Sequence, residues 1–356
     1  MTPLIRARID GAALAANLAR VRQIAPRSKV MAVIKANAYG HGLLIAARAL
    51  RDADALAVAR LEEALPLRRA GIRQQIVLLE GVNDAEHLDE AGAQQLDLVV
   101  HDPSHLPLLA GYRGDHRFHL WIKVDTGMNR LGFRPEQYAG VLQQLRALQP
   151  ASLRLMTHLA GADDPEGEEV GQQMARFQPL LAGNTLEVSI ANSAALLSAP
   201  ALHADWVRPG LALYGVSPFA HRNGADLGLE PAMTLETTVI AVREVPAGEC
   251  VGYGGAWQAA RDSRIAILAA GYADGLLRGL PNGTPVALNG GRASLVGRVS
   301  MDMVAVDVTD LPPVQVGDRA QLWGAQLPVE ELARTARTIP YELLCGISQR
   351  VPLDTD

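Results

Sequence analysis

The sequence contains few cysteines and no excess of basic residues. Its two cysteines, Cys250 and Cys345, cannot build a disulfide framework or a metal cluster by themselves, so we expect a reducing, cytoplasmic location and no metal site. The formal net charge is -5, which argues against nucleic acid as a partner. The apolar runs are no longer than strands and the N-terminus is charged throughout, so we expect neither a membrane span nor a signal peptide.

Aromatic residues are also scarce, at 4% of the chain, yet seven of them are tyrosines. Tyr39, Tyr253, Tyr272 and Tyr341 lie next to glycines or other residues that break regular structure. An ordinary packed core residue is less expected in such a context.

What the 356 residues do contain is a regular alternation of strand and helix patterns. Almost continuous apolar runs are typical of strands covered on both faces, and amphipathic stretches of helical period separate them. Eight successive β/α units predict a TIM barrel, an α/β fold. A doubly wound open sheet is the alternative, but no strand is followed by the G-x-G-x-x-G turn that would favour it. The expected strands span residues 30–36, 55–59, 75–81, 96–102, 119–125, 153–160, 186–192 and 211–215.

The pattern changes after about Pro231. β-branched segments separated by Gly, Pro and Asn turns follow, and helical patterns return only near the end of the chain. We therefore expect two domains, a TIM-barrel domain over residues 10–225 and a mostly β C-terminal domain over residues 226–356. Residues 1–9 are expected to form a strand that joins the second domain.

Candidate site residues gather where the expected barrel strands end. Barrel enzymes build their sites at the carboxyl ends of the strands. Each residue found there is, taken alone, more often structural than functional, but their joint position on one rim predicts a site. They are Lys35 and Tyr39 after the first strand, Arg130 after the fifth, His158 at the sixth, Asn192 and Ser193 at the seventh, and Arg208 and Gly210 before the eighth.

These residue types favour an aldehyde cofactor that carries a phosphate. The loops after strands seven and eight of a barrel often bind phosphate, and here they offer the Ser193 hydroxyl and the backbone amides of Gly210 and Leu211. Lys35 presents an amine from the first strand, across the barrel mouth. Pyridoxal 5'-phosphate, bound to Lys35 as a Schiff base, fits this description.

Several longer motifs carry a resemblance to a known family. From about Arg6 to Pro352 the chain resembles alanine racemase, a fold-type III pyridoxal-phosphate enzyme. The resemblance implies interconversion of L-alanine and D-alanine by two-base proton transfer on a pyridoxal-phosphate aldimine. It also implies a homodimer in which the β domain of one subunit completes the active site of the other. The motifs are "AVIKANAYGHG", "KVDTGMNRLG", "THLAGADD", "ANSAA", "VRPGLALYG", "VGYGG", "GYADG", "VGRVSMDM" and "TIPYELLCGISQRVP".

The resemblance also implies a role for each matching residue. Lys35 corresponds to the Schiff-base lysine and to the base that serves D-alanine, and Tyr253 to the opposite base, from the partner subunit, that serves L-alanine. The phosphate contacts of the family match Tyr39, Ser193, Gly210, Leu211 and Tyr341. Arg208 matches the residue at the pyridine nitrogen, with His158 beside it, and the contacts to the substrate carboxylate match Arg130 and the backbone of Met301. Lys123 matches an often carbamylated lysine that orients Arg130, and residues near the entrance match Asp163, Tyr272, Arg278 and Asp302.

The chain departs from the family pattern at two places. Leu276 and Leu277 follow "GYADG", where the family often has an aromatic residue and a proline, which affects the entrance contacts of Arg278. Leu159 and Gly161 stand where bulkier residues are common, which affects substrate size. The substrate range, and a biosynthetic or a catabolic role, stay open.

Two other functions are alternatives. One is another amino-acid enzyme of this fold type, such as a broader racemase or a decarboxylase, and the other is a non-catalytic pyridoxal-phosphate carrier. "KANAYGHG" favours the racemase, and the β extension argues against the carrier.

Structural roles are also open for five of these residues. Tyr253 is alternatively a turn residue, Asn192 and Ser193 a helix N-cap, Met301 a core residue and Lys123 a buried ion-pair lysine.

The chemistry of racemisation explains these residue types. Two bases on opposite faces can remove a Cα proton from one side and return a proton to the other. A tyrosine has an unperturbed pKa of about 10, so its phenolate needs cationic neighbours, and we expect His158 and Arg208 to supply that field. Arginine stays protonated in proteins, so Arg208 should keep the pyridine nitrogen unprotonated.

Overall fold

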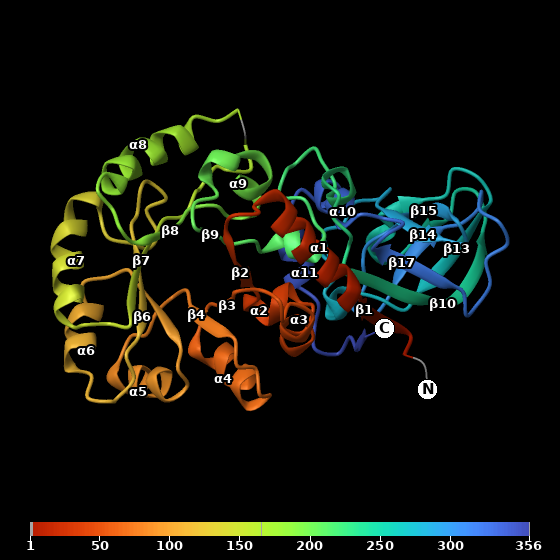
Figure 1. The fold of residues 1–356 in the computed structure, drawn as a ribbon. Helices are drawn as coiled ribbons and strands as arrows, with labels where there is room; N and C mark the ends of the chain where they lie inside the picture. The colour runs from red at the N-terminus through yellow and green to blue at the C-terminus, as the bar shows by residue number, and fades with distance from the viewer. Residues whose placement is uncertain (1–2, 165, 356) are drawn as a thin grey trace. The chain divides into compact units, whose positions relative to one another are not determined.

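A computed structural model describes residues 3–164 and 166–355, and Figure 1 shows the course of the chain. These residues form two compact units. The first, here named the barrel unit, comprises Ala15–Ala38 and Ala46–Leu213. The second, here named the β unit, takes in Tyr39–Ile45, the chain from Tyr214 onward and the first strand of the chain.

Within the described residues, eight parallel strands close a barrel in the barrel unit, which confirms the predicted TIM-barrel fold. Every residue of β3 and β5 is buried, as expected for strands covered on both faces. Figure 1 shows α6, α7 and α8 on the outer side of β6 and β7. The strands are β2 (Lys29–Val33), β3 (Ala55–Val58), β4 (Gln75–Leu78), β5 (Asp97–Val100), β6 (His119–Lys123), β7 (Ser152–Met156), β8 (Glu187–Ser189) and β9 (Trp206–Val207).

Helices alternate with these strands along the sequence. The helices of this part of the chain are α1 (Gly11–Ile24), α2 (Lys35–Tyr39), α3 (Leu43–Ala49), α4 (Leu61–Arg69), α5 (Ala85–Ala93), α6 (His105–Gly111), α7 (Tyr138–Ala147), α8 (Glu169–Leu181) and α9 (Ser193–Ser198).

The predicted position of the eighth strand is wrong. Residues 211–215 form no strand, because Leu211–Tyr214 is a 3₁₀ helix (η3), and the barrel closes instead through β9, which pairs with β2. All four residues of η3 are fully buried, and a short buried apolar run does not distinguish a strand from a helix by its periodicity. Pro209 and Gly210 gave the available signal, since such a pair favours a turn. Arg208 and Gly210 therefore follow the eighth strand, at its carboxyl end.

A cluster of charged and aromatic residues fills part of the barrel interior. Arg154 on β7 lies against two indole rings, with its guanidinium carbon 5.1 Å from the ring centroid of Trp121 and 5.3 Å from that of Trp206. The same guanidinium forms ion pairs with Asp97 at 3.3 Å and Glu187 at 2.9 Å. Burial raises the pKa of Asp97 to about 6, although Arg154 opposes this shift. The charge of Arg154 is thus paired with two carboxylates and contacts two aromatic rings.

The β unit is built on an eight-stranded, mostly antiparallel sheet, which confirms the predicted mostly β C-terminal domain. Strand β1 (Ile5–Ile9) pairs antiparallel with β10 (Met233–Val245), with Ala7 opposite Leu235, and parallel with β18 (Leu353–Thr355). The other elements are β11 (Cys250–Val251), β12 (Trp257–Gln258), β13 (Ser263–Leu268), β14 (Pro285–Leu288), β15 (Gly291–Val296), β16 (Val304–Asp307), β17 (Arg319–Trp323), α10 (Val329–Ala336) and α11 (Pro340–Cys345).

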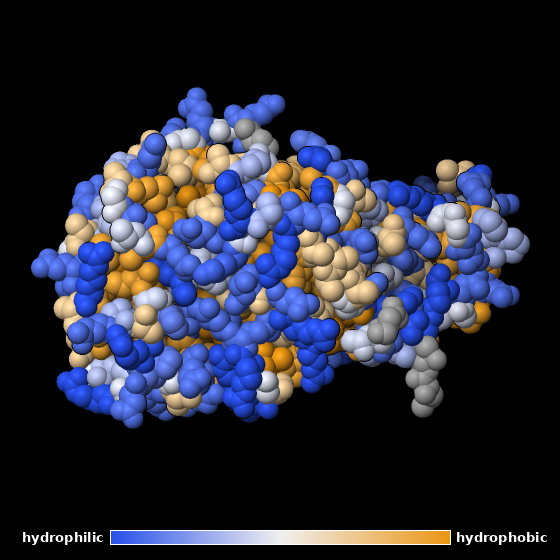
Figure 2. Space-filling view, viewed as in Figure 1, coloured by the Kyte–Doolittle hydropathy of each residue, from blue (hydrophilic) through white to orange (hydrophobic). Residues whose placement is uncertain are grey.

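The surface mixes polar and apolar residues. In the space-filling view of Figure 2, hydrophilic residues cover much of the face in view and apolar residues show as patches among them. Among the helices of residues 3–164 and 166–355, none combines the length and the apolar character that crossing a membrane requires.

Candidate active site

Lys35 stands at the carboxyl end of β2, where the chain takes an unusual turn. The four residues 36–39 that follow it have φ angles between 52° and 55°, which is the left-handed region. That region costs a non-glycine residue roughly 1–2 kcal/mol, so other contacts must hold the turn. The carboxylate of Glu63 accepts the N–H of Ala36 at 2.6 Å and the N–H of Ala59 at 2.8 Å. Glu63 thereby ties the turn after Lys35 to the end of β3, and such held strain is typical of functional positions.

Lys35 is one of only three lysines in the sequence, the others being Lys29 and Lys123. Lys29 begins β2, and its Nζ lies 2.5 Å from Oε1 of Glu187. Lys123 is the last residue of β6. Since all barrel strands are parallel, Lys35 and Lys123 lie at the mouth where barrel sites form, and Lys29 lies at the other end.

Arg208 follows β9 and is held rigidly inside the barrel unit. Its guanidinium donates hydrogen bonds to Ser189 Oγ at 2.5 Å, to the Thr157 carbonyl at 2.6 Å and to the Ile190 carbonyl at 3.2 Å. Only 6% of its surface is exposed. Burial lowers the pKa of Arg208 to about 10, which still leaves the side chain protonated at neutral pH. The site therefore contains one fixed, buried positive charge.

His158 lies beside Arg208 and carries no charge of its own. Arg208 Nη2 lies 3.4 Å from His158 Nδ1, and because arginine has only donors, Nδ1 is the acceptor and the neutral ring has its proton on Nε2. Burial lowers the pKa of His158 well below its usual value, and the positive charges of Arg208 and Lys123 lower it further. The expectation that His158 supplies a cationic field is therefore wrong, and of the two residues expected to supply it Arg208 carries the charge.

Lys123 and Arg130 belong to the same positive cluster but are not hydrogen-bonded to each other in the described residues. Burial lowers the pKa of Lys123 to about 8, and the charges of Arg208, Arg130 and Lys35 act in the same direction. The amine is thus neutral in part at neutral pH. Arg130 is exposed, in the loop after β6 that Asp125 organises by accepting the N–H groups of Gly127 and Asn129.

Ser193 and Gly210 are brought together by a direct hydrogen bond. Ser193 Oγ accepts the N–H of Gly210 at 2.9 Å and the N–H of Ala212 at 3.2 Å, so the Gly210 amide is directed at Ser193. The hydroxyl proton of Ser193 stays available for donation. Leu211 begins η3. Asn192 is the N-cap of α9, where its side chain accepts the N–H of Ala195 at 3.0 Å, so the N-cap interpretation holds for Asn192.

In the β unit, Tyr39 and Tyr341 form part of one aromatic row. The ring centroid of Tyr39 lies 5.7 Å from that of Tyr341 and 4.8 Å from that of Tyr214. Burial raises the pKa of Tyr39 far above its usual value, and Tyr341 and Cys345 act in the same direction. Tyr39 therefore keeps its phenolic proton and can donate a hydrogen bond to an anion.

Tyr253, Tyr272 and Met301 are exposed on the β unit. Tyr253 is 69% exposed in the 3₁₀ turn η5 (Tyr253–Gly255), and Met301 is 53% exposed. The Met301 carbonyl accepts the N–H of Ala273 at 2.9 Å, which places Met301 beside the Tyr272 turn. Here the structural interpretation of Met301 as a core residue is wrong, since its side chain faces solvent in this chain.

The remaining entrance candidates are spread over both units. Arg350 ties Asp302 to the buried Asp274, with contacts of 2.8 Å and 2.6 Å. Asp163 and Arg278 are exposed, and no hydrogen bond or ion pair joins either of them to another described residue. Leu276 is buried, which accounts for an apolar residue at this departure from the family pattern.

The residues of the barrel unit suit pyridoxal phosphate by their chemistry. An amine at Lys35, a fixed cation at Arg208 and a hydroxyl donor at Ser193 match an aldehyde, a pyridine nitrogen and a phosphate. This donor set therefore fits the cofactor.

Sequence reasoning missed the residues that hold this site in place. Glu63 supports the turn after Lys35, and Ser189 and the Thr157 carbonyl hold Arg208. Glu63 stands two residues into a predicted helix, where an acidic residue is ordinary, so only its distant partners reveal the role. The "DTG" stretch after β6 did carry a signal for Asp125, because an aspartate before a glycine favours such a turn.

Comparisons with known proteins agree over the whole chain. The family description "Alanine racemase, N-terminal domain" matches residues 9–218, and "Alanine racemase, C-terminal domain" matches residues 232–355. An alanine racemase of Yersinia pestis bv. Antiqua (strain Angola) is 48% identical over 350 residues, and one of Nitrosococcus oceani is 49% identical over 346 residues, each with 97% of both chains covered. The structure of the biosynthetic alanine racemase from Pseudomonas aeruginosa superposes with a TM-score of 0.96 at 44% identity, with 100% of both chains covered.

Proposed function

The chain belongs to the alanine racemase family, and on that basis we propose that it interconverts L-alanine and D-alanine with pyridoxal 5'-phosphate as its cofactor. The observation that carries this proposal is the cluster at the ends of the barrel strands. It combines the amine of Lys35, the fixed guanidinium of Arg208 and the hydroxyl of Ser193.

We assign the cofactor contacts as follows. Lys35 would hold the aldehyde carbon and Arg208 would face the pyridine nitrogen, with His158 beside Arg208 as a neutral acceptor. Since Arg208 keeps its proton, it would donate a hydrogen bond to the ring nitrogen and leave that nitrogen unprotonated. The proposed phosphate contacts are the side chains of Ser193, Tyr39 and Tyr341. The backbone amides of Gly210 and Leu211 and the N-cap residue Asn192 form the segments of backbone beside Ser193 that support this phosphate site.

Two bases then act on the bound amino acid. The cofactor, when bound, withdraws electrons and so makes the Cα proton acidic. Lys35 accepts or returns this proton on one face of Cα, and Tyr253 does so on the other face. Arg130 and the backbone N–H of Met301 bind the substrate carboxylate and thereby orient Cα between the two bases.

The active enzyme is proposed to be a homodimer with shared sites. Tyr253, Tyr272, Met301 and Met303 are all exposed in this chain, at 69%, 39%, 53% and 44%. Tyr272 and Met303 are each joined to Ser300 by a backbone hydrogen bond, and such neighbouring exposed apolar residues favour a protein interface. A partner subunit that covers them would bring the partner's Tyr253 to the barrel mouth of this chain. Asp163, Arg278 and Asp302 are proposed entrance residues of that shared site.

Two finer proposals concern Lys123 and the cellular location. The lowered pKa of Lys123, about 8, leaves the neutral amine that reaction with carbon dioxide requires, so we propose that Lys123 is carbamylated and orients Arg130. A cytoplasmic location is supported by the exposed thiols of Cys250 and Cys345, which form no disulfide among the described residues, because exposed thiols persist in a reducing compartment.

A direct assay tests the proposed function. Purified protein is incubated with L-alanine, and D-alanine is measured with and without added cofactor. Borohydride reduction and peptide mapping should then find the pyridoxyl group on Lys35 among the three lysines. Lys35→Arg should abolish racemisation, and Lys29→Arg, which keeps the charge opposite Glu187, is the matched control. Full activity in the Lys35→Arg variant, or label on Lys123 instead, would contradict the assignment.

A further inference from the structure

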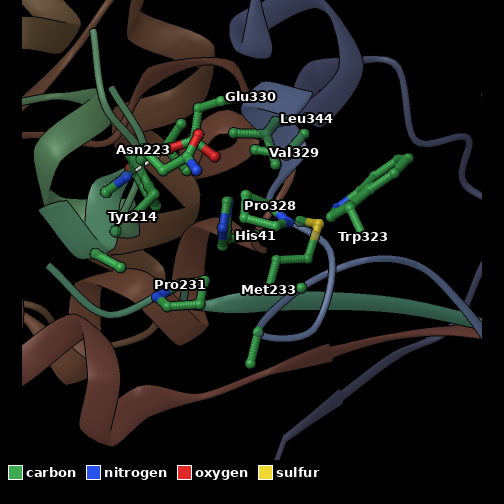
Figure 3. A pocket seen from close by; sticks show the side chains of 16 residues that line it. His41, Tyr214, Asn223, Pro231, Met233, Trp323, Pro328, Val329, Glu330 and Leu344 are labelled. Atoms are coloured by element: carbon green, nitrogen blue, oxygen red, sulfur yellow. Dashed lines mark hydrogen bonds between the residues drawn. The ribbon is translucent and has the colours of Figure 1, made fainter. Parts of the chain in front are cut away.

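The β unit contains a cavity that none of the proposed active-site residues lines. Its volume is about 110 Å³. All of its lining residues belong to the β unit, and they come from the loop before α3, from the end of η3 and the chain between η3 and β10, and from β10, α10, α11 and the end of β17. Most of these residues are buried, whereas the lining residues Ala225 and Ala325 are exposed. Figure 3 shows the cavity with its lining side chains.

One end of the cavity presents an unused hydrogen-bond donor. Trp323, the last residue of β17, is 1% exposed, and its Nε1–H has no hydrogen-bond partner among the described residues. A buried donor without a partner costs about 1–3 kcal/mol. Figure 3 shows Trp323 at one end of the cavity, with its nitrogen on the side toward Met233. The neighbouring Gly324 has a φ of 146°, and a Cβ there would lie 2.7 Å from Oγ1 of Thr234, so this position next to Trp323 requires glycine.

The opposite end of the cavity presents a fixed acceptor. Glu330 on α10 is 5% exposed, and its Oε1 accepts the N–H of Ser217 at 2.9 Å and the N–H of Gly224 at 2.8 Å. Its second oxygen, Oε2, accepts no hydrogen bond within residues 3–164 and 166–355. Figure 3 shows the Glu330 carboxylate with Asn223 at the end of the cavity away from Trp323. The cavity therefore has a donor at one end and an acceptor at the other.

The walls between these ends suit a flat ring. The imidazole of His41 lines the middle of the cavity, and its ring centroid lies 4.5 Å from that of Tyr214. Met233 and Leu344 add apolar surface, and a methionine sulfur is a favourable neighbour for an aromatic ring. This cavity, at about 110 Å³, is smaller than the apolar protein cavity of roughly 150 Å³ that binds benzene, so its upper limit is one small five- or six-membered ring.

We propose that this cavity is a binding site for a small single-ring compound with a hydrogen-bond acceptor and a hydrogen-bond donor on opposite sides of the ring. The acceptor takes the Nε1–H of Trp323, and the donor faces Oε2 of Glu330. Such a ligand satisfies the buried indole N–H and packs on His41 and Met233. The site is independent of the racemase activity proposed above, since it shares no residue with the cofactor or substrate contacts.

The probe is 4-pyridone, which has a carbonyl oxygen and an N–H on opposite sides of one ring. The holoenzyme is labelled with nitrogen-15, and the indole N–H resonances of its four tryptophans are followed by NMR during a titration. Trp323→Phe identifies the Trp323 resonance. We expect a saturable shift of that resonance alone. N-methyl-4-pyridone, which has no donor for Glu330, should bind about tenfold more weakly.

A second variant keeps the test decisive if Trp323→Phe does not fold. Ala325→Phe adds a large side chain to the lining of the cavity but leaves Trp323 and Glu330 in place, so it should abolish the shift while the protein still racemises alanine. The proposal is overturned if the Trp323 resonance does not move at about 20 mM probe, which detects millimolar dissociation constants. An equal shift of all four indole resonances, or an undiminished shift in Ala325→Phe, overturns it as well.

Discussion

Arg208 and His158 form a hydrogen-bonded pair of unequal charge, in which Arg208 Nη2 lies 3.4 Å from Nδ1 of a neutral His158. The arginine is also held by the Thr157 carbonyl and Ser189, so it cannot turn away from the ring. The barrel mouth therefore has one fixed cation, and the histidine next to it acts as an acceptor. This charge state leads to a measurable pH dependence.

The first prediction concerns the titration of His158. Burial lowers the pKa of His158 in the folded protein. Below the unfolded pKa of about 6.5 the unfolded chain takes up a proton that folded His158 does not, so the stability that His158 contributes above this pH is lost as the pH falls. NMR of labelled histidines should show no titration of His158 between pH 6 and 7. His87 is the internal control, because Asp84 raises its pKa above the usual value. His158→Gln identifies the resonance, and a midpoint of His158 near pH 6.5 would contradict the prediction.

The second prediction concerns the left-handed turn after Lys35. Glu63→Ala removes the acceptor for the N–H groups of Ala36 and Ala59, at a cost of about 2 kcal/mol or more, and releases the strained residues 36–39. We expect lower stability in urea and a loss of racemase activity of about tenfold or more, because Lys35 is no longer positioned. Glu62→Ala is the matched control, since Glu62 is the exposed neighbouring glutamate. If Glu63→Ala and Glu62→Ala lowered stability and activity equally, the role assigned to Glu63 would be contradicted.

The third prediction separates the two bases. Tyr253→Phe removes the phenolic proton carrier but keeps the ring, and Tyr253 is 69% exposed, so folding and cofactor binding should persist. In deuterated water, exchange of the Cα proton of L-alanine should fall by roughly a hundredfold or more, while exchange of D-alanine continues slowly through Lys35. An equal fall for both enantiomers, at a step shown to be proton abstraction, would require another assignment of the bases.

The fourth prediction tests the shared active site. Lys35 lies in the barrel unit and Tyr253 in the β unit, so mixed dimers of Lys35→Ala and Tyr253→Phe chains should contain one site free of both substitutions. Co-expression of the two chains should raise the racemase activity well above the low activity of either variant alone. Activity is measured on heterodimers purified through two different affinity tags. Inactive heterodimers that still bind the cofactor would argue for sites made within one subunit.

The fifth prediction concerns the stability of the barrel interior. Burial favours the protonated form of Asp97 and raises its folded pKa to about 6, above the unfolded pKa near 3.8. The contribution of Asp97 to stability is therefore fully present below pH 3.8 and is lost as the pH rises through about 6. Asp97→Asn cannot ionise. The stability of this variant relative to the parent protein should therefore improve between pH 4 and pH 7, by up to ~3 kcal/mol. Urea unfolding at fixed protein concentration measures the difference. Asp89→Asn, at an exposed position, should show no such trend.

The sequence alone was sufficient for the barrel fold and for seven of its eight strands. Buried parallel strands have a local signature, a short apolar run, and seven of the eight were found by it. The residue that ends such a run lies at the strand end, so Lys35 and His158 could be placed without coordinates. The eighth strand failed because the buried run 211–214 is a 3₁₀ helix, and burial removes the polar alternation that would separate the two.

Other features depend on residues that are far apart in the chain, and only the tertiary structure decided them. The charge state of His158 follows from burial and from Arg208, which is fifty residues away. The turn after Lys35 depends on Glu63, and the cavity joins Trp323 at the end of a strand to Glu330 on a helix. The sequence determined which segments are buried and where they end, because apolar periodicity is local. The tertiary structure determined charges, strain and empty space, because desolvation and hydrogen-bond partners are set by packing between distant segments.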